Sequence, residues 1–164
     1  MFLGVISDTH DNLSAIEKAV EEFNKRNVAL VLHAGDFVSP FTANIFSKLK
    51  CKLIGVFGNV DGEKEHLRER FNAIGAEIVG DFAEVEFHGV KIALIHGVHE
   101  AIVKSLAKSG EYALVVRGHT HRAKVEKIGE AIVVNPGEAC GYLTGNKTIA
   151  VIKIPELVAE MISL

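Results

Sequence analysis

Short apolar runs alternate with helical stretches along the first half of the chain, and this alternation limits the possible folds most strongly. Residues 2–7, 29–34 and 51–57 are the apolar runs, and they have the continuous hydrophobicity of strands buried on both faces. Each is followed by a stretch with helical character, at residues 13–26, 41–50 and 63–74. The resulting βαβαβ order predicts a parallel sheet with helices packed against it.

Two local signals mark where helices begin. Asn12 stands just before the apolar stripe of the first helical stretch and is predicted to be its N-cap. Ser39 followed by Pro40 predicts a second N-cap, because proline is favoured at the first helical position.

The pattern changes in the second half, where hairpins replace most of the helices. Residues 83–96 are predicted to form two strands with a turn near His88 and Gly89, and residues 122–138 a hairpin that turns at Gly129. A helix is expected at residues 101–108 and a strand before the polar loop that follows. The last stretch, 148–164, begins as a strand and ends either as a strand or as a short helix.

These elements predict an α/β sandwich, with one mixed sheet or two sheets of mixed strands and helices outside them. The chain has 164 residues, which suits a single domain over residues 1–164. Hydrophobic residues make up 48% and charged residues 24%, as in ordinary globular proteins, so the chain can bury a sizeable core without disulfides or structural metals.

Charge, hydropathy and cysteine usage exclude several classes of function. The net charge is −3 and no basic block is present, so nucleic acid is an unlikely partner. No apolar run is long enough to cross a bilayer, and the first residues lack the basic region of a signal peptide, so we expect no membrane partner. Cys51 and Cys140 form no CxxC motif and are far apart in sequence, which favours a reducing compartment and predicts a cytoplasmic protein.

Five polar clusters each follow an apolar strand, and together they predict one site. They are DTH at residues 8–10, GD at 35–36, GN at 58–59, HG at 96–97 and GHTH at 118–121. Ligands bind beyond the carboxyl ends of strands in open α/β sheets, so the clusters meet if the strands share a direction. Carboxylate, amide and imidazole donors without thiolates suit Mn, Fe, Ni, Co or Zn.

The five motifs, in this order, resemble those of the calcineurin-like metallophosphoesterase superfamily, in particular its minimal prokaryotic phosphodiesterase branch. The resemblance runs from Asp8 to about Gly137. It implies that superfamily's two-sheet fold and a divalent-metal-dependent phosphodiesterase. Such an enzyme hydrolyses phosphate esters with a hydroxide that bridges two metal ions.

The resemblance also implies a role for each donor. The first ion would be held by Asp8, His10 and His121. The second would be held by Asn59, His96 and His119. Asp36 would bridge the two ions and orient the hydroxide. Two divalent ions per chain follow, with Mn favoured and Ni, Fe, Co and Zn as alternatives.

The chain departs from the superfamily pattern at Val60, where many members have a histidine that protonates the leaving group. Asp61 and His99 are the candidate replacements. Capping of the following helix is the favoured interpretation of Asp61, and His99 could equally be a solvated loop residue. A substrate with a good leaving group would need no acid from the enzyme.

Three residues near the motifs are candidate substrate contacts: Asn12, Arg117 and Arg122. An arginine can pair with a phosphate oxygen, although flanking arginines are usually solvated, and capping explains Asn12 as well. His33 is predicted to be a hydrogen-bonded core histidine. The NPGE segment that ends at Glu138 is interpreted as a plain turn.

The competing functions differ in class. The first is a phosphodiesterase acting on a small phosphate ester, which the complete ligand set favours. The second is a protein-binding scaffold with weak or no catalysis, like the retromer subunit of the same superfamily. A phosphomonoesterase or a nuclease of the same fold is the third, although a nuclease usually needs a basic surface or an added domain.

Overall fold

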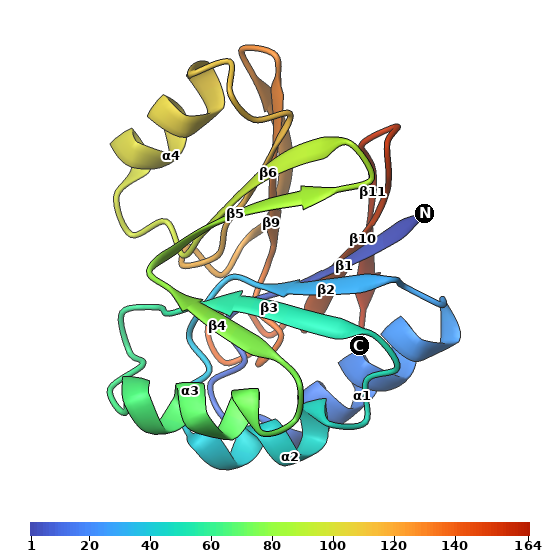
Figure 1. Ribbon diagram of the computed structural model, residues 1–164, viewed down its shortest axis with the longest axis vertical. Coiled ribbons are helices and arrows are strands. Elements are labelled where there is room, and N and C mark those ends of the chain that lie inside the picture. The colour runs from blue at the N-terminus through green and yellow to red at the C-terminus, as the bar shows by residue number, and fades with distance from the viewer.

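The computed structural model describes residues 1–164 as two sheets packed face to face, with helices on both outer sides (Figure 1). The first sheet has six strands in the order β11-β10-β1-β2-β3-β4. Its strands are β1 (Phe2–Ile6), β2 (Leu30–His33), β3 (Lys52–Val56), β4 (Glu77–Gly80), β10 (Thr148–Lys153) and β11 (Val158–Ser163). The four strands β1 to β4 are parallel, and the last two add to one side in antiparallel fashion.

The second sheet has five strands in the order β5-β6-β7-β9-β8. They are β5 (Phe82–Phe87), β6 (Val90–Ile95), β7 (Leu114–Val116), β8 (Ala123–Ile128) and β9 (Ala131–Pro136). Its three central strands are parallel to one another, and an antiparallel hairpin closes each side. The two sheets therefore confirm the predicted sandwich of mixed strands.

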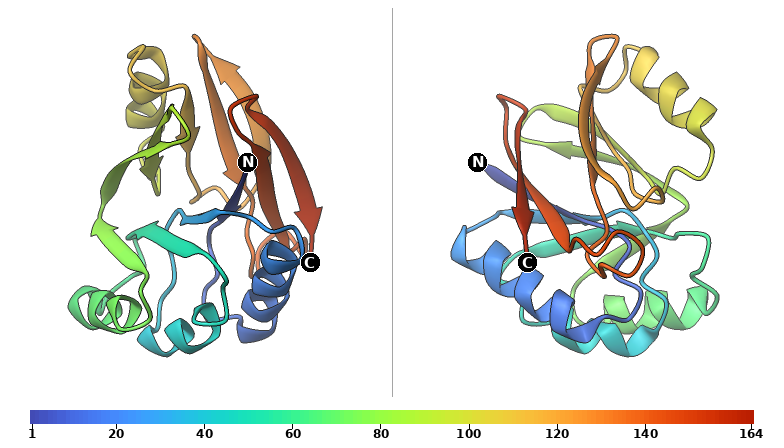
Figure 2. Two further views of the ribbon diagram at one scale, coloured as in Figure 1. Left: turned by 45° about the vertical axis from the view of Figure 1, so that its right-hand side comes forward. Right: turned by 180° about the vertical axis from the view of Figure 1, so that it is seen from behind.

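Helices cover the outer face of each sheet, as Figure 2 shows from two further directions. The first sheet carries α1 (Leu13–Lys25), the 3₁₀ turn η1 (Pro40–Thr42), α2 (Ala43–Phe46) and α3 (Lys64–Asn72). The second sheet carries α4 (Glu100–Lys108), which contacts β7 and β9. No helix is long and apolar enough to span a membrane.

The core has a layer on each side of the first sheet and a smaller one under α4. Leu3, Leu32 and Leu94 belong to the layer between the two sheets. Phe23 and Phe71 belong to the layer between the first sheet and its helices, and both are fully buried. This burial on both faces explains why the parallel strands are continuously apolar in the sequence.

Most of the predicted elements are present, with α1 as the clearest case. The Asn12 side chain accepts a hydrogen bond from the Ala15 amide at 3.2 Å, which confirms the predicted N-cap. The C-terminal stretch ends as strand β11, paired antiparallel with β10.

The predicted helix at residues 41–50 was too long. The 3₁₀ turn and α2 end at Phe46, and Asn24 of α1 explains the early end. Its side chain donates to the Lys48 carbonyl and accepts from the Lys50 amide, which fixes a turn where the helix would have continued. The Ser39 side chain makes no cap hydrogen bond and instead donates to the carboxylate of Asp11.

Strand β4 was not predicted. Its four residues, EIVG, end in glycine and carry one fully buried side chain, Ile78, so they lack the periodicity of a longer strand. The strand forms because it pairs in parallel with β3 and extends the sheet over α3. A contact between distant segments thus outweighs a weak local preference.

Candidate metal centre

The parallel strands of both sheets bring the five polar clusters to one edge of the sandwich. The clusters follow β1, β2 and β3 in the first sheet and β6 and β7 in the second. Parallel strands end on the same side, so the loops converge. All seven side chains that the sequence singled out lie in one connected group: Asp8, His10, Asp36, Asn59, His96, His119 and His121.

Asp8, His10, Asp36 and His121 form the first half of the group, with donor atoms all within 4.8 Å of one another. His10 Nε2 lies 3.8 Å from Asp8 Oδ1 and 3.5 Å from Asp36 Oδ2, and His121 Nε2 lies 3.2 Å from Asp8 Oδ1. Asp8 Oδ1 and His10 Nε2 are buried and have no hydrogen-bond partner. Buried polar atoms are normally paired, so these two orphans fit a site that a cation completes.

Asn59, His96 and His119 form the second half. Asn59 Oδ1 lies 3.0 Å from His96 Nε2 and 3.0 Å from His119 Nδ1. His96 Nε2 also lies 3.3 Å from Asp36 Oδ2. One oxygen of Asp36 therefore approaches an imidazole in each half, which gives this carboxylate the central position of the group.

The carboxylates favour positive charge at this place. The nearby carboxylates of Asp8 and Asp36 raise the pKa of His10 above its usual value, against burial. Burial alone would lower the pKa of His96, but hydrogen bonding to Asp36 and the charge of that carboxylate raise it. Burial would raise the pKa of Asp36, yet the interaction with His96 lowers it. The pKa of His119 is lowered, by burial and by the neighbouring His96.

The backbone is strained at the same residues. Asp8, His10, Asp36, His119 and His121 have positive φ values of 53°, 38°, 61°, 69° and 60°. This left-handed region is unfavourable for residues other than glycine, and such conformations gather at functional sites. Five of them in one cluster indicate that the fold keeps the backbone strained in order to direct these side chains inward.

Glu138 is a neighbour of the donor group that the sequence interpretation missed, since the NPGE segment is not a plain turn. Its carboxylate is fully buried and accepts a hydrogen bond from His121 Nδ1 at 2.6 Å. Burial would raise the pKa of Glu138, but hydrogen bonds from His121 and Thr144 outweigh it and lower the pKa to about 2. A carboxylate in this position fixes the orientation of the imidazole, as it does behind many metal-binding histidines.

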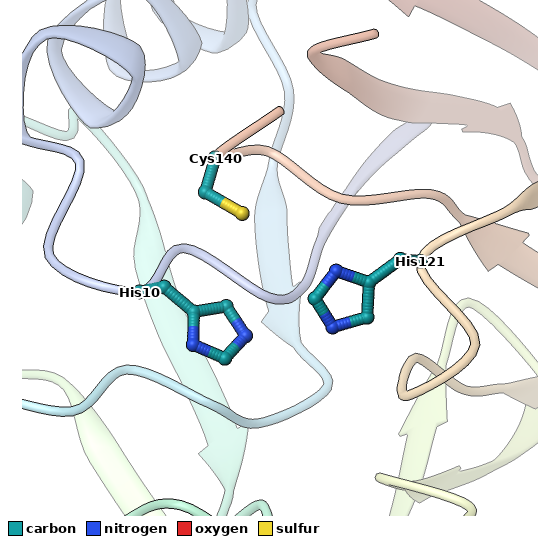
Figure 3. Close-up of side chains that lie close together, drawn as sticks. All are labelled: His10, His121 and Cys140. Carbon is teal, nitrogen blue, oxygen red and sulfur yellow. The ribbon is translucent and has the colours of Figure 1, made fainter. Parts of the chain in front are cut away.

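Cys140 places a thiol beside the first half of the group, although the sequence predicted a set of donors without sulfur. Figure 3 shows its Sγ directed toward the space between His10 and His121, and the three side chains form a compact cluster. The thiol donates to Glu138 Oε2 at 3.2 Å, and burial raises its pKa to about 12. The sulfur is therefore a protonated neighbour bound to Glu138.

The two candidate proton donors lie in different surroundings. The carboxylate of Asp61 is buried and accepts backbone N–H groups from Asp36, Val38 and Gly58 at 2.7–3.0 Å. It holds two of the converging loops together and caps no helix, so the capping interpretation was wrong. His99 is exposed and lines a pocket of about 280 Å³ beside Asn59 and His96.

The candidate substrate contacts are partly engaged elsewhere. Asn12 caps α1 and donates to the Cys140 carbonyl at 2.8 Å. Arg117 is buried, pairs with Glu100 and donates to the carbonyls of Gly97 at 2.7 Å and Gly118 at 3.3 Å, so the expectation of a solvated side chain was wrong.

Arg122 is exposed and makes no ion pair. It lines a pocket of about 500 Å³ next to the GHTH loop, together with Lys124 and Thr120. His33 is fully buried, stacks on Phe37 and contacts Thr9 Oγ1 at 3.2 Å, as predicted for a core histidine.

A pocket of about 350 Å³ opens over the group of donors. Five of the seven side chains line it, and so does Thr120 of the GHTH loop. Its remaining wall is formed by Val60, Tyr142 and Leu143. The last two residues follow Glu138 in sequence and were not predicted to belong to the site.

Comparison with known proteins identifies the family to which the chain belongs. The model of the calcineurin-like phosphoesterase superfamily domain matches residues 1–156. The chain belongs to this superfamily. It is 44% identical over 153 residues to the phosphodiesterase MJ0936 of Methanocaldococcus jannaschii, covering 93% of this chain and 92% of that one.

Solved structures of superfamily members agree with the fold. The structure of a novel archaeal phosphodiesterase superposes with a TM-score of 0.96 at 42% identity over the full length of both chains. Vps29 from Entamoeba histolytica superposes with a TM-score of 0.73 at 16% identity, over 100% of this chain and 99% of that one. The second likeness is one of fold alone.

Proposed function

We propose that the protein is a divalent-metal-dependent phosphodiesterase that acts on a small phosphate-ester substrate. The observation that carries the proposal is the connected group of carboxylates and imidazoles with two buried, unpartnered donor atoms, Asp8 Oδ1 and His10 Nε2. The phosphodiesterase MJ0936, at 44% identity, supports the reaction class.

The two halves of the group suggest the sites of two ions. Asp8, His10 and His121 would hold the first, and Asn59, His96 and His119 the second. Asp36 would contact both, because its Oδ2 lies near an imidazole of each half. The donor set suits Mn, Ni, Fe, Co or Zn, and we favour Mn.

When bound, such ions would lower the pKa of water toward neutrality and neutralise the charge that develops on the phosphate. The residues of the chain would position these groups. Asp36, through Oδ1, accepts the Val60 amide at 3.1 Å and so keeps Oδ2 directed at the two imidazoles. Glu138 holds His121, and the Ala34 carbonyl lies 2.7 Å from His96 Nδ1, so both rings are fixed from behind.

Protonation of the leaving group depends on what borders the pocket. Asp61 is occupied by three backbone amides, so we place the role of donor, if a side chain fills it, on His99. Val60 replaces the usual histidine and offers no proton.

Because Val60 offers no proton, we expect the enzyme to favour substrates with acidic leaving groups. A Brønsted series of aryl diesters measures this, and a rate independent of leaving-group pKa would contradict it.

Metal removal tests the proposed reaction. Protein stripped with a chelator is expected to lose hydrolysis of bis(p-nitrophenyl) phosphate, and Mn²⁺ to restore it, because the bound ions would lower the pKa of the attacking water. A screen of Mn, Ni, Co, Fe and Zn against mono- and diesters identifies the preferred ion and separates a diesterase from a monoesterase. Full activity of exhaustively stripped protein would overturn the proposal.

Metal is also expected to stabilise the fold, because an ion that binds the native state alone adds free energy by mass action. At about 100 times Kd the gain is about 2.7 kcal/mol, which raises Tm by roughly 5–10 °C in a domain of this size. Thermal melting with and without Mn²⁺ measures the shift. His119→Ala should reduce it, whereas His66→Ala, at an exposed helix position, should not. Equal Tm values with and without metal would contradict a preformed site.

A further inference from the structure

Three apolar side chains lie exposed at the mouth of the metal centre. Val60, Tyr142 and Leu143 are 43%, 63% and 76% exposed and line the pocket over the donor group. Exposed apolar residues need no explanation when they are scattered, but a set that borders a pocket points to a binding surface. Here the set borders the same pocket as five of the seven donor side chains.

The backbone under these side chains is firmly held. Glu138 accepts the amide of Leu143 at 3.1 Å and the hydroxyl of Thr144 at 2.7 Å. The Cys140 amide donates to the Asp8 carbonyl at 3.1 Å. The loop is therefore tied at both ends to the residues that shape the metal centre. Exposed apolar side chains on a fixed backbone form a ready surface, because little conformational freedom is lost on binding.

We propose that Val60, Tyr142 and Leu143 form a wall that binds a neutral, aromatic substituent of the substrate. This proposal rests on the proposed phosphodiesterase function. We call these three residues the apolar wall. The Tyr142 ring offers a planar face for stacking, and its hydroxyl makes no hydrogen bond within the protein.

The charges of the pocket argue against an anionic substituent there. No lysine or arginine lines it, so an anionic substituent away from the metal ions would find no cationic side chain to pair with. The unpaired Arg122 lies in the neighbouring pocket, on the other side of Thr120. The apolar wall thus determines specificity toward aryl or nucleobase-like groups, whereas a charged group would gain nothing from it.

Two phosphonates that differ in one substituent test the wall directly. Phenylphosphonate and methylphosphonate carry the same charged head group, and calorimetry with Mn²⁺-loaded protein measures the affinity of each. We expect phenylphosphonate to bind at least about tenfold more tightly, since burying a ring against apolar side chains is favourable. The double variant Tyr142→Ala with Leu143→Ala should bring the two affinities within about twofold.

Val158→Ala is the matched control, because Val158 is 63% exposed on the distant strand β11. It should keep the full preference for the phenyl compound. Three outcomes would each overturn the proposed binding role of the apolar wall. They are equal affinities of the wild type for the two compounds, no binding of phenylphosphonate, and a preference for phenylphosphonate that survives the double variant. Absence of diester hydrolysis with every ion, alongside a retained phenyl preference, would instead contradict the proposed function and leave the wall supported.

Discussion

Replacement of Asp36 by asparagine is expected to reduce phosphodiesterase activity at least about a hundredfold and to weaken the binding of both metal ions. Asp36 Oδ2 lies 3.5 Å from His10 Nε2 and 3.3 Å from His96 Nε2, so it reaches both halves of the donor group. The amide removes the negative charge and leaves one good oxygen donor. Groups that merely support a metal ligand contribute about 10–100-fold, so Asp36, as the proposed ligand of two ions, should contribute at least as much.

Asp36→Asn changes the charge of the side chain and is expected to leave the fold intact. Asparagine keeps an oxygen that can accept the Val60 amide, so the loop is retained. His10→Ala should be less damaging, because His10 belongs to one half of the group. Asp81→Asn, at a side chain that is 80% exposed and paired with Lys64, is the matched control and should leave both measurements unchanged. The two measurements are metal titration by calorimetry and diester hydrolysis at saturating metal. Tight binding of two ions by Asp36→Asn would show that Asp36 does not bridge the two ions.

The residues that the sequence predicted well are those whose role follows from local pattern and strand direction. The parallel strands β1, β2 and β3 are recognisable because burial on both faces makes them continuously apolar. Once their direction is known, Asp8, Asp36 and Asn59 must lie at one edge, since parallel strands end together. The cluster of donors was therefore predictable from the sequence, and so was the sandwich that supports it.

Other residues could not be assigned, because their partners are set by the folded chain. Glu138 meets His121 because the antiparallel β8–β9 hairpin pairs Ala123 with Pro136, and the same register carried two residues further places Glu138 opposite His121. Two signals were available: the predicted hairpin over residues 122–138, whose ends lie beside the GHTH loop, and the charge itself, because a buried glutamate needs a partner. Arg117 likewise resembled a solvated flanking residue, yet it bridges the loops that carry His96 and His119.

Replacement of Glu138 by glutamine is expected to weaken metal binding about 10–100-fold, although Glu138 is not among the proposed ligands. The carboxylate accepts His121 Nδ1 and holds the ring so that Nε2 faces Asp8. The same carboxylate accepts the backbone amides of Leu143 and Thr144. Glutamine replaces one acceptor oxygen with an N–H donor, so at least one of these buried groups loses its partner.

An unpaired buried donor costs about 1–3 kcal/mol, so Glu138→Gln should also lower the Tm of metal-free protein by roughly 2–12 °C. Thr144→Val removes a single donor and leaves the carboxylate on His121, so it should lower Tm less and leave metal affinity nearly unchanged. Glu130→Gln, at a side chain that is 94% exposed, is the control for the change of charge. Calorimetric titration and metal-free melting separate the two effects. A Glu138→Gln protein that melts lower but binds metal as the wild type does would show that Glu138 supports the Tyr142–Leu143 loop without orienting His121.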